Sequence, residues 1–324
     1  RPRRSEDEHT LRFKLFRYGS YLPLSDALPM MENMGLRVLS EHPYEMQLGT
    51  GNIHVQDFVI APRHGADFDV DAVKEHFQDA FERIFRGEAE NDGFNKLILR
   101  AGLDWRQVAT LRGYCKYLLQ TGVPFSQTYM EETLNRYPLH ARLLVELFEA
   151  KFDPARDAAS RTMTEAARRR LQRDIEPLLG EQVAKTHANL AAEIATSRGF
   201  SRAVQIDTVV QQLNGVMDTV GSLDEDRILR SFMAVILATL RTSHYQLVNG
   251  RPKEYVSFKL DPAKVPDLPK PRPYREIFVY SPRVEGVHLR FGPVARGGLR
   301  WSDRREDFRT EVLGLVKAQM VKNT

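Results

Sequence analysis

Cysteine is almost absent from this chain of 324 residues, which contains a single one, Cys115. One cysteine excludes an internal disulfide and fits a reducing, cytoplasmic compartment. Cys115 lies in the apolar run over residues 111–119, so we expect a buried thiol rather than a nucleophile. No metal site is predicted, because His42, His54 and His64 lack metal-ligand spacing and are expected to face solvent near loops.

Long apolar runs are missing as well. The longest, residues 232–240, is far shorter than the ~20 residues that cross a bilayer, so no membrane partner is predicted. The first ten residues, RPRRSEDEHT, have no initiating Met and no apolar core, which argues against a signal peptide. We therefore expect the chain to be cut from something larger.

Charge of one sign is also lacking. The chain has 47 Lys and Arg against 43 Asp and Glu, a net formal charge of +4, although its pI is about 9.1. The basic residues are interspersed with acids and form no stripe of the kind that dedicated nucleic-acid binders show. No nucleic-acid partner is predicted.

Alternating and helical apolar patterns predict an α+β fold in three regions. In residues 1–94, Leu11, Phe13 and Leu15 alternate with charged residues, and residues 36–40, 44–48 and 53–61 indicate three more strands. Two helices with apolar stripes complete an α/β sandwich there. No polar cluster indicates an effector site, so a structural or assembly role is favoured for this region.

Residues 95–250 are expected to be almost wholly helical, with Ser126 and the acidic segment at 223–227 marking two helix starts. The proline-rich segment at 265–273 predicts a linker or crossover. Strands are predicted at 256–260, 277–280, 287–291 and 299–301, followed by a helix over 305–324. In that helix Phe308, Val312, Leu315 and Val316 are expected to face inward.

The stretch RFGPVARGGLRWSDRREDFRTEVLGLVKAQMVKNT, residues 290–324, predicts an anion site. Arg296 stands before Gly297 and Gly298, and backbone without side chains lets a ligand approach while a guanidinium holds a carboxylate. Gln319 and Lys322 are three residues apart and share a helix face. Each piece also has a structural interpretation, since Gly-Gly pairs form turns and lysines complement helix C-termini.

The segments GPVARGGLRWSDR and DFRTEVLGLVKAQMVKNT closely resemble the large bacterial NAD-dependent glutamate dehydrogenases. SLDEDRILRSF and ATLRTSHYQ, further upstream, are similar to the same family. The resemblance implies an ACT-like regulatory module at 1–94, a helical domain at 95–250 and the first part of the substrate domain at 251–324. It also implies a cytoplasmic bacterial oxidoreductase of amino-acid catabolism that forms a homo-oligomer.

By this resemblance, Arg296 binds the side-chain carboxylate of L-glutamate or 2-oxoglutarate, beside Gly297 and Gly298, and Gln319 with Lys322 binds the α-carboxylate. The sequence departs from the pattern of ordinary glutamate dehydrogenases, because arginine replaces lysine at 296 and one extra residue separates it from Gly292-Pro293. The family's catalytic lysine and aspartate and its NAD-binding domain are expected beyond Thr324. The 324 residues alone are therefore expected to be inactive.

Two other hypotheses remain open at this point. The chain could be a non-catalytic regulatory or assembly scaffold that keeps the dehydrogenase pattern as structure only. Nucleic-acid binding through the arginines is the weaker of the two, since successive residues such as those at 168–170 cannot share one helix face.

Overall fold

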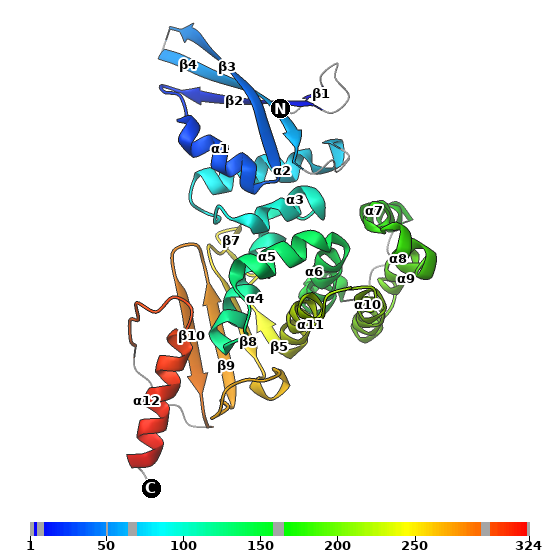
Figure 1. Ribbon diagram of the computed structural model, residues 1–324, viewed down its shortest axis with the longest axis vertical. Coiled ribbons are helices and arrows are strands. Elements are labelled where there is room, and N and C mark those ends of the chain that lie inside the picture. Colours follow the sequence, from blue (N-terminus) through cyan, green and yellow to red (C-terminus); the bar gives the residue numbers. More distant parts are fainter. Residues whose placement is uncertain are drawn as a thin grey trace. The chain divides into compact units, whose positions relative to one another are not determined.

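The structure is a computed structural model that describes residues 3–4, 10–49, 51–63, 70–157, 165–292 and 299–322. The chain forms two compact units, Arg1–Val108 and Ala109–Thr324. Helices and antiparallel sheets occur in both units (Figure 1), which confirms the mixed α+β class. No helix in the described ranges is long and apolar enough to cross a membrane.

A four-stranded antiparallel sheet forms the centre of the first unit. Its strands run in the order β1-β2-β4-β3, with bounds Arg3–Arg4, Leu11–Tyr18, Gly51–Pro62 and Leu36–Leu48 respectively. The helices of this unit are α1 (Leu24–Asn33), α2 (Val70–Phe85) and α3 (Leu97–Arg100), with the 3-10 turn η1 (Gly93–Lys96) before α3. Phe13 of β2 contacts Phe77 and Phe81 of α2, with ring centroids 5.4 and 5.1 Å apart. The alternation of Leu11 and Phe13 therefore marks the helix-facing side of this sheet.

Two predictions for the first unit are wrong. The strands expected at 36–40 and 44–48 are one strand, β3, which continues through His42 and Pro43. Proline is tolerated there because β3 is an edge strand and one of its sides has no ladder bonds to lose. His54 does not face solvent: strand alternation turns it inward, only 8% exposed, with its ring 4.2 Å from that of Tyr21. His42 is exposed as expected, and His64 lies outside the described residues.

Helices dominate the chain from residue 97 to 238, as the sequence predicts, but the helical region ends before residue 250 because residues 239–242 form the strand β5. Their bounds are α4 (Trp105–Thr121), α5 (Gln127–Arg136), α6 (Pro138–Phe152), η2 (Pro154–Arg156), α7 (Glu165–Ile175), η3 (Glu176–Leu178), α8 (Glu181–Thr186), α9 (Leu190–Ser197), α10 (Arg202–Met217) and α11 (Leu223–Ala238). The hydroxyl of Ser126 accepts a hydrogen bond from the backbone N–H of Tyr129, 3.2 Å away, which confirms the predicted start of α5. Ser222 caps α11 in the same way.

A second antiparallel sheet lies in the Ala109–Thr324 unit, in the order β10-β9-β8-β5. Its strands are β5 (Thr239–Thr242), β8 (Val256–Leu260), β9 (Arg275–Tyr280) and β10 (Glu285–Arg290). The short pair β6 (Leu247–Val248) and β7 (Arg251–Pro252) and the 3-10 turn η4 (Pro262–Lys264) lie in its connections, and α12 (Phe308–Lys322) is the last element of the described residues. The proline-rich segment at 265–273 is the connection between β8 and β9, which are adjacent antiparallel strands, so it is not a crossover.

Helix α4 covers one face of this sheet. Tyr114 stacks on Phe258 of β8 with ring centroids 4.1 Å apart, and Tyr117 contacts Phe278 of β9 at 5.6 Å. The close approach needs Gly113, since a Cβ there would lie 2.9 Å from the Phe258 ring. Cys115 is buried, as expected for an unreactive thiol.

Candidate functional site

Helix α12 holds the C-terminal part of the predicted site and is fixed at its first turn. Arg309, the second residue of the helix, is fully buried and bonds Glu276 of β9, which is also fully buried. Arg309 Nε donates to Glu276 Oε1 over 2.6 Å and Nη2 donates to Oε2 over 3.0 Å. Two parallel bonds between planar groups fix the orientation of the guanidinium as well as its distance.

Glu276 reaches this position because of the register of the sheet. Within β9 it alternates in phase with Phe278 and Tyr280, whose rings lie on the face covered by α4. Its neighbours across the strands are Leu260 of β8 and Leu289 of β10. A carboxylate in an apolar row is costly to bury without a partner, and Arg309 provides one.

Gln120, near the end of α4, joins the start of α12 to the same core. Its side-chain oxygen accepts a bond from the backbone N–H of Arg309 at 3.1 Å, and its Nε2 donates to the carbonyl of Arg305 at 2.8 Å. The first N–H groups of a helix lack hydrogen-bond partners within the helix. Gln120 provides an acceptor for one of these groups, the N–H of Arg309. Phe308 adds an apolar contact, with its ring parallel to Phe278 and centroids 6.4 Å apart.

The segment before α12 does not form the predicted strand at 299–301. Leu299 is fully exposed and Trp301 is 78% exposed, so neither side chain packs on the sheet. Arg300 instead pairs with Glu311 of α12 at 2.6 Å, and the Ser302 hydroxyl donates to the same carboxylate at 2.7 Å. Without burial, nothing favours a fifth strand over these local contacts.

The predicted helix over 305–324 begins later, at Phe308, because residues 305–307 form a turn. The residues of α12 that are exposed also differ from those predicted. Leu313 is buried and Val312 and Val316 are half-buried, but Leu315 is 45% exposed, so the expectation that it faces inward is wrong. The N-terminal half of α12 is thus packed and the C-terminal half is open, as its projecting end in Figure 1 illustrates.

The predicted site residues are placed only in part. Gln319 lies on the exposed C-terminal half of α12. Lys322 is the last residue of the helix, and its side chain is not among those described. Arg296, Gly297 and Gly298 lie outside the described residues. The helix therefore puts Gln319 and Lys322 three residues apart on one element, and their role in binding stays a prediction.

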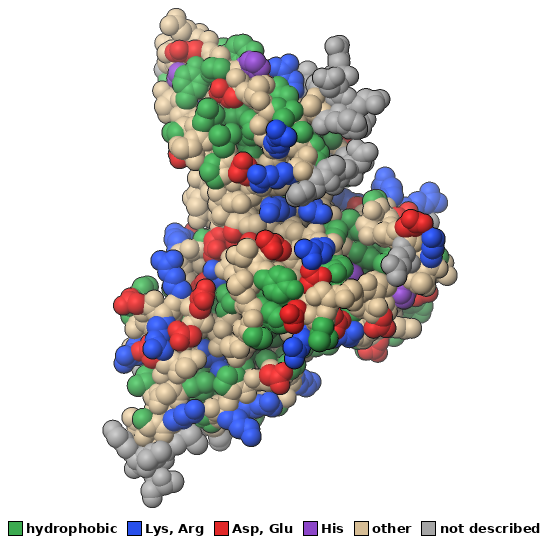
Figure 2. Space-filling view, viewed as in Figure 1, with side chains coloured by type: hydrophobic (Ala, Val, Ile, Leu, Met, Phe, Trp, Pro, Cys, Tyr) green, Lys and Arg blue, Asp and Glu red, His purple; other side chains and the backbone are tan. Residues whose placement is uncertain are grey.

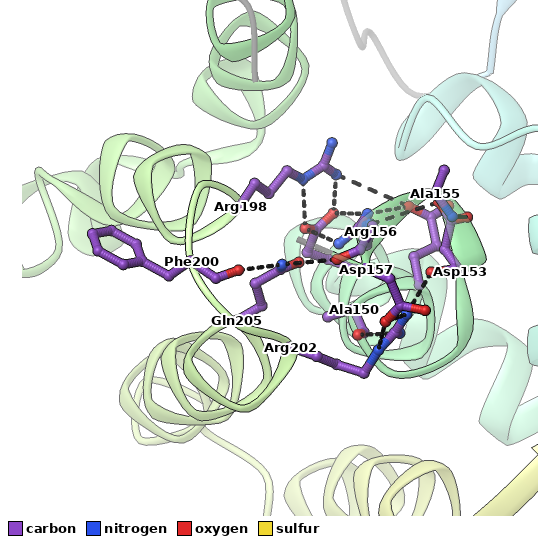
Figure 3. Close-up of polar contacts among 11 residues, drawn as sticks. Ala150, Asp153, Ala155, Arg156, Asp157, Arg198, Phe200, Arg202 and Gln205 are labelled. Carbon is purple, nitrogen blue, oxygen red and sulfur yellow. Dashed lines mark hydrogen bonds and ion pairs between the residues drawn. The ribbon is translucent and has the colours of Figure 1, made fainter. Parts of the chain in front are cut away.

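A second buried charge cluster lies among the helices of the same unit (Figure 3). Glu146 of α6 is 2% exposed and accepts bonds from two arginines, with Arg156 Nη1 at 2.7 Å and Arg198 Nε at 3.0 Å. Arg156 also bonds Glu149 at 2.5 Å. We call Glu146, Glu149, Arg156 and Arg198 the Glu146 cluster. It ties α6 to the turn η2 and to the residue that follows α9.

The charges in the Glu146 cluster shift the pKa of its central carboxyl. Burial alone would raise the pKa of Glu146, but the positive charges of Arg156 and Arg198 and their hydrogen bonds outweigh it and hold the pKa well below its usual value. Glu146 is therefore ionised at neutral pH. The cluster pairs its own charges internally, which is the pattern of a structural clamp.

Sequence patterns did not predict either buried cluster. One signal was present, because Glu276 directly precedes the predicted strand at 277–280 and is in phase with its Phe278 and Tyr280. Its partner Arg309 lies 33 residues away, and no spacing rule connects the two. Basic and acidic side chains are interspersed on the face in Figure 2, so surface charge gives no further indication of a site there. No group of metal-ligating side chains occurs among the described residues.

Three family models match the chain in sequence order. They are "Glutamate dehydrogenase, ACT3 domain" over residues 1–73, "Glutamate dehydrogenase, helical motif 3" over 89–154, and "Bacterial NAD-glutamate dehydrogenase, catalytic domain" over 212–324. The chain is also 46% identical over 319 residues to the NAD-specific glutamate dehydrogenase of Halomonas elongata. The proteins of the same name from Pseudomonas aeruginosa and Mycobacterium tuberculosis are 45% and 42% identical over 321 and 313 residues.

This chain belongs to the bacterial NAD-glutamate dehydrogenase family. The alignments cover 98%, 98% and 94% of it, and the chain spans 17% of the length of each of these relatives. The resemblance found in the sequence is thereby confirmed. The catalytic-domain match of the glutamate dehydrogenase family contains β8, β9, β10 and α12, and with them the Glu276–Arg309 pair.

Proposed function

We propose that the chain is part of an NAD-dependent glutamate dehydrogenase, which converts L-glutamate and water to 2-oxoglutarate and ammonia while NAD accepts a hydride. The observation that supports this most strongly is the identity of 42–46% along nearly the whole chain to three NAD-specific glutamate dehydrogenases. The catalytic-domain match over residues 212–324 supports it further, since that range contains all five predicted site residues.

In this proposal the chain contributes to binding and orienting the dicarboxylate. Gln319 and Lys322 hold the α-carboxylate from α12, and Arg296 holds the side-chain carboxylate, with Gly297 and Gly298 allowing close approach of the backbone. Two fixed carboxylates leave Cα in one orientation, and positioning of this kind supplies much of the rate of an enzymatic reaction. Arginine at 296 would grip its carboxylate with two bonds where lysine offers a point charge.

The described residues do not form a parallel-sheet binding site of the kind that usually holds NAD. Dinucleotides are usually held at the carboxyl ends of a parallel sheet, where a helix begins. Every strand pair in the described ranges is antiparallel. We therefore assign no described residue of this chain to NAD binding.

Glutamate saturation of the complete enzyme that contains this chain tests the proposal. Lys322→Ala should raise the KM for glutamate about a hundredfold, since a charge-assisted bond to a carboxylate is lost, while the KM for NAD stays the same. Lys317→Ala is the matched control, because Lys317 is an exposed lysine on the same helix. NADH formation at 340 nm reports both.

The scaffold hypothesis makes the opposite prediction for the same variants. If Lys322→Ala disrupts assembly and leaves the glutamate KM unchanged, the chain acts as a regulatory or assembly module. If the complete wild-type protein forms no NADH from glutamate, the proposed activity itself is wrong.

A further inference from the structure

The place of the Glu276–Arg309 pair in the core does not require an ion pair for stability. Both side chains are fully buried, and the cross-strand neighbours of Glu276 are Leu260 and Leu289. Two apolar side chains would fill such a place at no loss of stability, because desolvating an ion pair costs about as much as the pairing returns. What an apolar pair cannot provide is direction, whereas two parallel hydrogen bonds fix the relative orientation of the two planar groups.

The other contacts at the start of α12 act at the same point. Gln120 holds the N–H of Arg309 and the carbonyl of Arg305, and Phe308 lies flat against Phe278. All of these contacts involve the first two residues of the helix or the turn before it. Glu311 adds a bond to Arg300, but that arginine is 60% exposed in its side chain and contributes little.

The far half of α12 is open, with Gly314, Leu315, Lys317, Ala318 and Gln319 all exposed. At about 1.5 Å of rise per residue, Gln319 lies about 15 Å beyond the buried pair along the helix axis. A tilt of about 10° at the pair would move Gln319 sideways by about 3 Å at that distance. Displacements of about 1 Å are enough to cost an enzyme about a hundredfold in rate.

We propose that Arg309, held by Glu276, is a positioning residue for glutamate, because it sets the angle of α12 and so the place of Gln319 and Lys322. The inference rests on the proposed function. It assigns no contact with substrate to Arg309 itself, which is fully buried. Glu276 and Gln120 act with it, one through the carboxylate and the other through the backbone of the helix.

The test uses the complete enzyme with the double variant Glu276→Leu/Arg309→Met, which replaces the pair by apolar side chains and leaves no unpaired charge. We expect cooperative unfolding near the wild-type temperature, a KM for glutamate raised at least about tenfold and a KM for NAD within about twofold. Hydrogen exchange at residues 315–322 should become faster. Arg309→Lys, which keeps the charge but loses the second bond, should give an intermediate glutamate KM.

Glu146→Gln is the matched control, because it removes another buried arginine partner in the same unit without touching α12. It should lower stability and leave the glutamate KM unchanged. An unchanged glutamate KM in Glu276→Leu/Arg309→Met overturns the positioning role, whatever the exchange data show. If the double variant does not fold, Arg309→Lys decides in the same way. Different results would contradict the proposed function: a wild-type enzyme that does not oxidise glutamate, or a Lys322→Ala variant with an unchanged KM for glutamate.

Discussion

Two buried arginine–glutamate clusters in the Ala109–Thr324 unit use the same chemistry for different purposes. The Glu146 cluster joins two arginines and two glutamates among helices, with Arg202 bonding the carbonyls of Ala150 and Asp153 nearby. The Glu276–Arg309 pair joins one strand to one end of one helix. A clamp among helices stabilises their packing, whereas a clamp at the packed end of a helix whose other half is exposed sets an angle.

The largest expected effect on stability is at Glu146. Glu146→Gln keeps the size of the side chain and removes its charge, which leaves Arg156 and Arg198 without their full counter-charge in a buried place. We expect a loss of about 3–5 kcal/mol in the free energy of unfolding, which is typical for removing one partner of a buried pair. Urea denaturation followed by circular dichroism measures it. A loss below about 1 kcal/mol would show that the cluster is not a clamp.

The pH dependence of stability should follow from the same carboxyl. The pKa of Glu146 is lower in the folded chain than in the unfolded one, so the folded state keeps this group ionised where the unfolded state binds a proton. Its contribution is fully present above the unfolded pKa of about 4.3 and is lost as the pH falls through the folded value. Wild type and Glu146→Gln should therefore differ most above about pH 5 and converge in stronger acid. A constant difference down to pH 2.5 would contradict the assignment.

Gly113→Ala should have an intermediate effect. The new Cβ would lie 2.9 Å from the Phe258 ring and 3.3 Å from Tyr280, both fixed in the core, so α4 must move away from the sheet. Overpacking of this kind costs about 1–3 kcal/mol. Because α4 also holds Gln120, this variant should raise the glutamate KM of the complete enzyme slightly. Thermal unfolding that does not change would show that α4 is not seated as closely as described.

The smallest effect is expected at the exposed pair Arg283–Glu254. Its side chains are 71% and 77% exposed, although it joins the same sheet as the buried pair. Glu254→Ala should change the free energy of unfolding by less than about 0.5 kcal/mol and leave both KM values unchanged. If Glu254→Ala destabilised the protein as much as a change in a buried cluster does, burial would not be what separates strong from weak ion pairs here.

The sequence predicted those parts of the structure that local rules determine. Alternation identified β2, β8, β9 and β10, and Ser126 and the acidic segment at 223–227 marked real helix starts. It failed where tertiary context decides. Pro43 signalled a break that an edge strand does not require, and Trp301 resembled a strand residue although no neighbouring strand pairs with it.

For the candidate site, the residues of the motif could be named from the sequence, but the buried contacts that hold α12 in place could not. Gln319 and Lys322 follow from a resemblance and a spacing of three residues. The pairing of Glu276 with Arg309, and of Gln120 with the backbone of α12, depends on how three elements far apart in the sequence meet. Contacts of that kind have no local pattern.

The most direct test of the account is a double-mutant cycle between Arg309 and Lys322 in the complete enzyme. Glu276→Leu/Arg309→Met and Lys322→Ala are measured separately and together through the KM for glutamate. If the buried pair acts by placing Lys322, its removal should change the KM much less once Lys322 is gone, so the two effects are not additive. Full additivity of the two effects on the glutamate KM would contradict the account, because it would mean that the buried pair and Lys322 act independently.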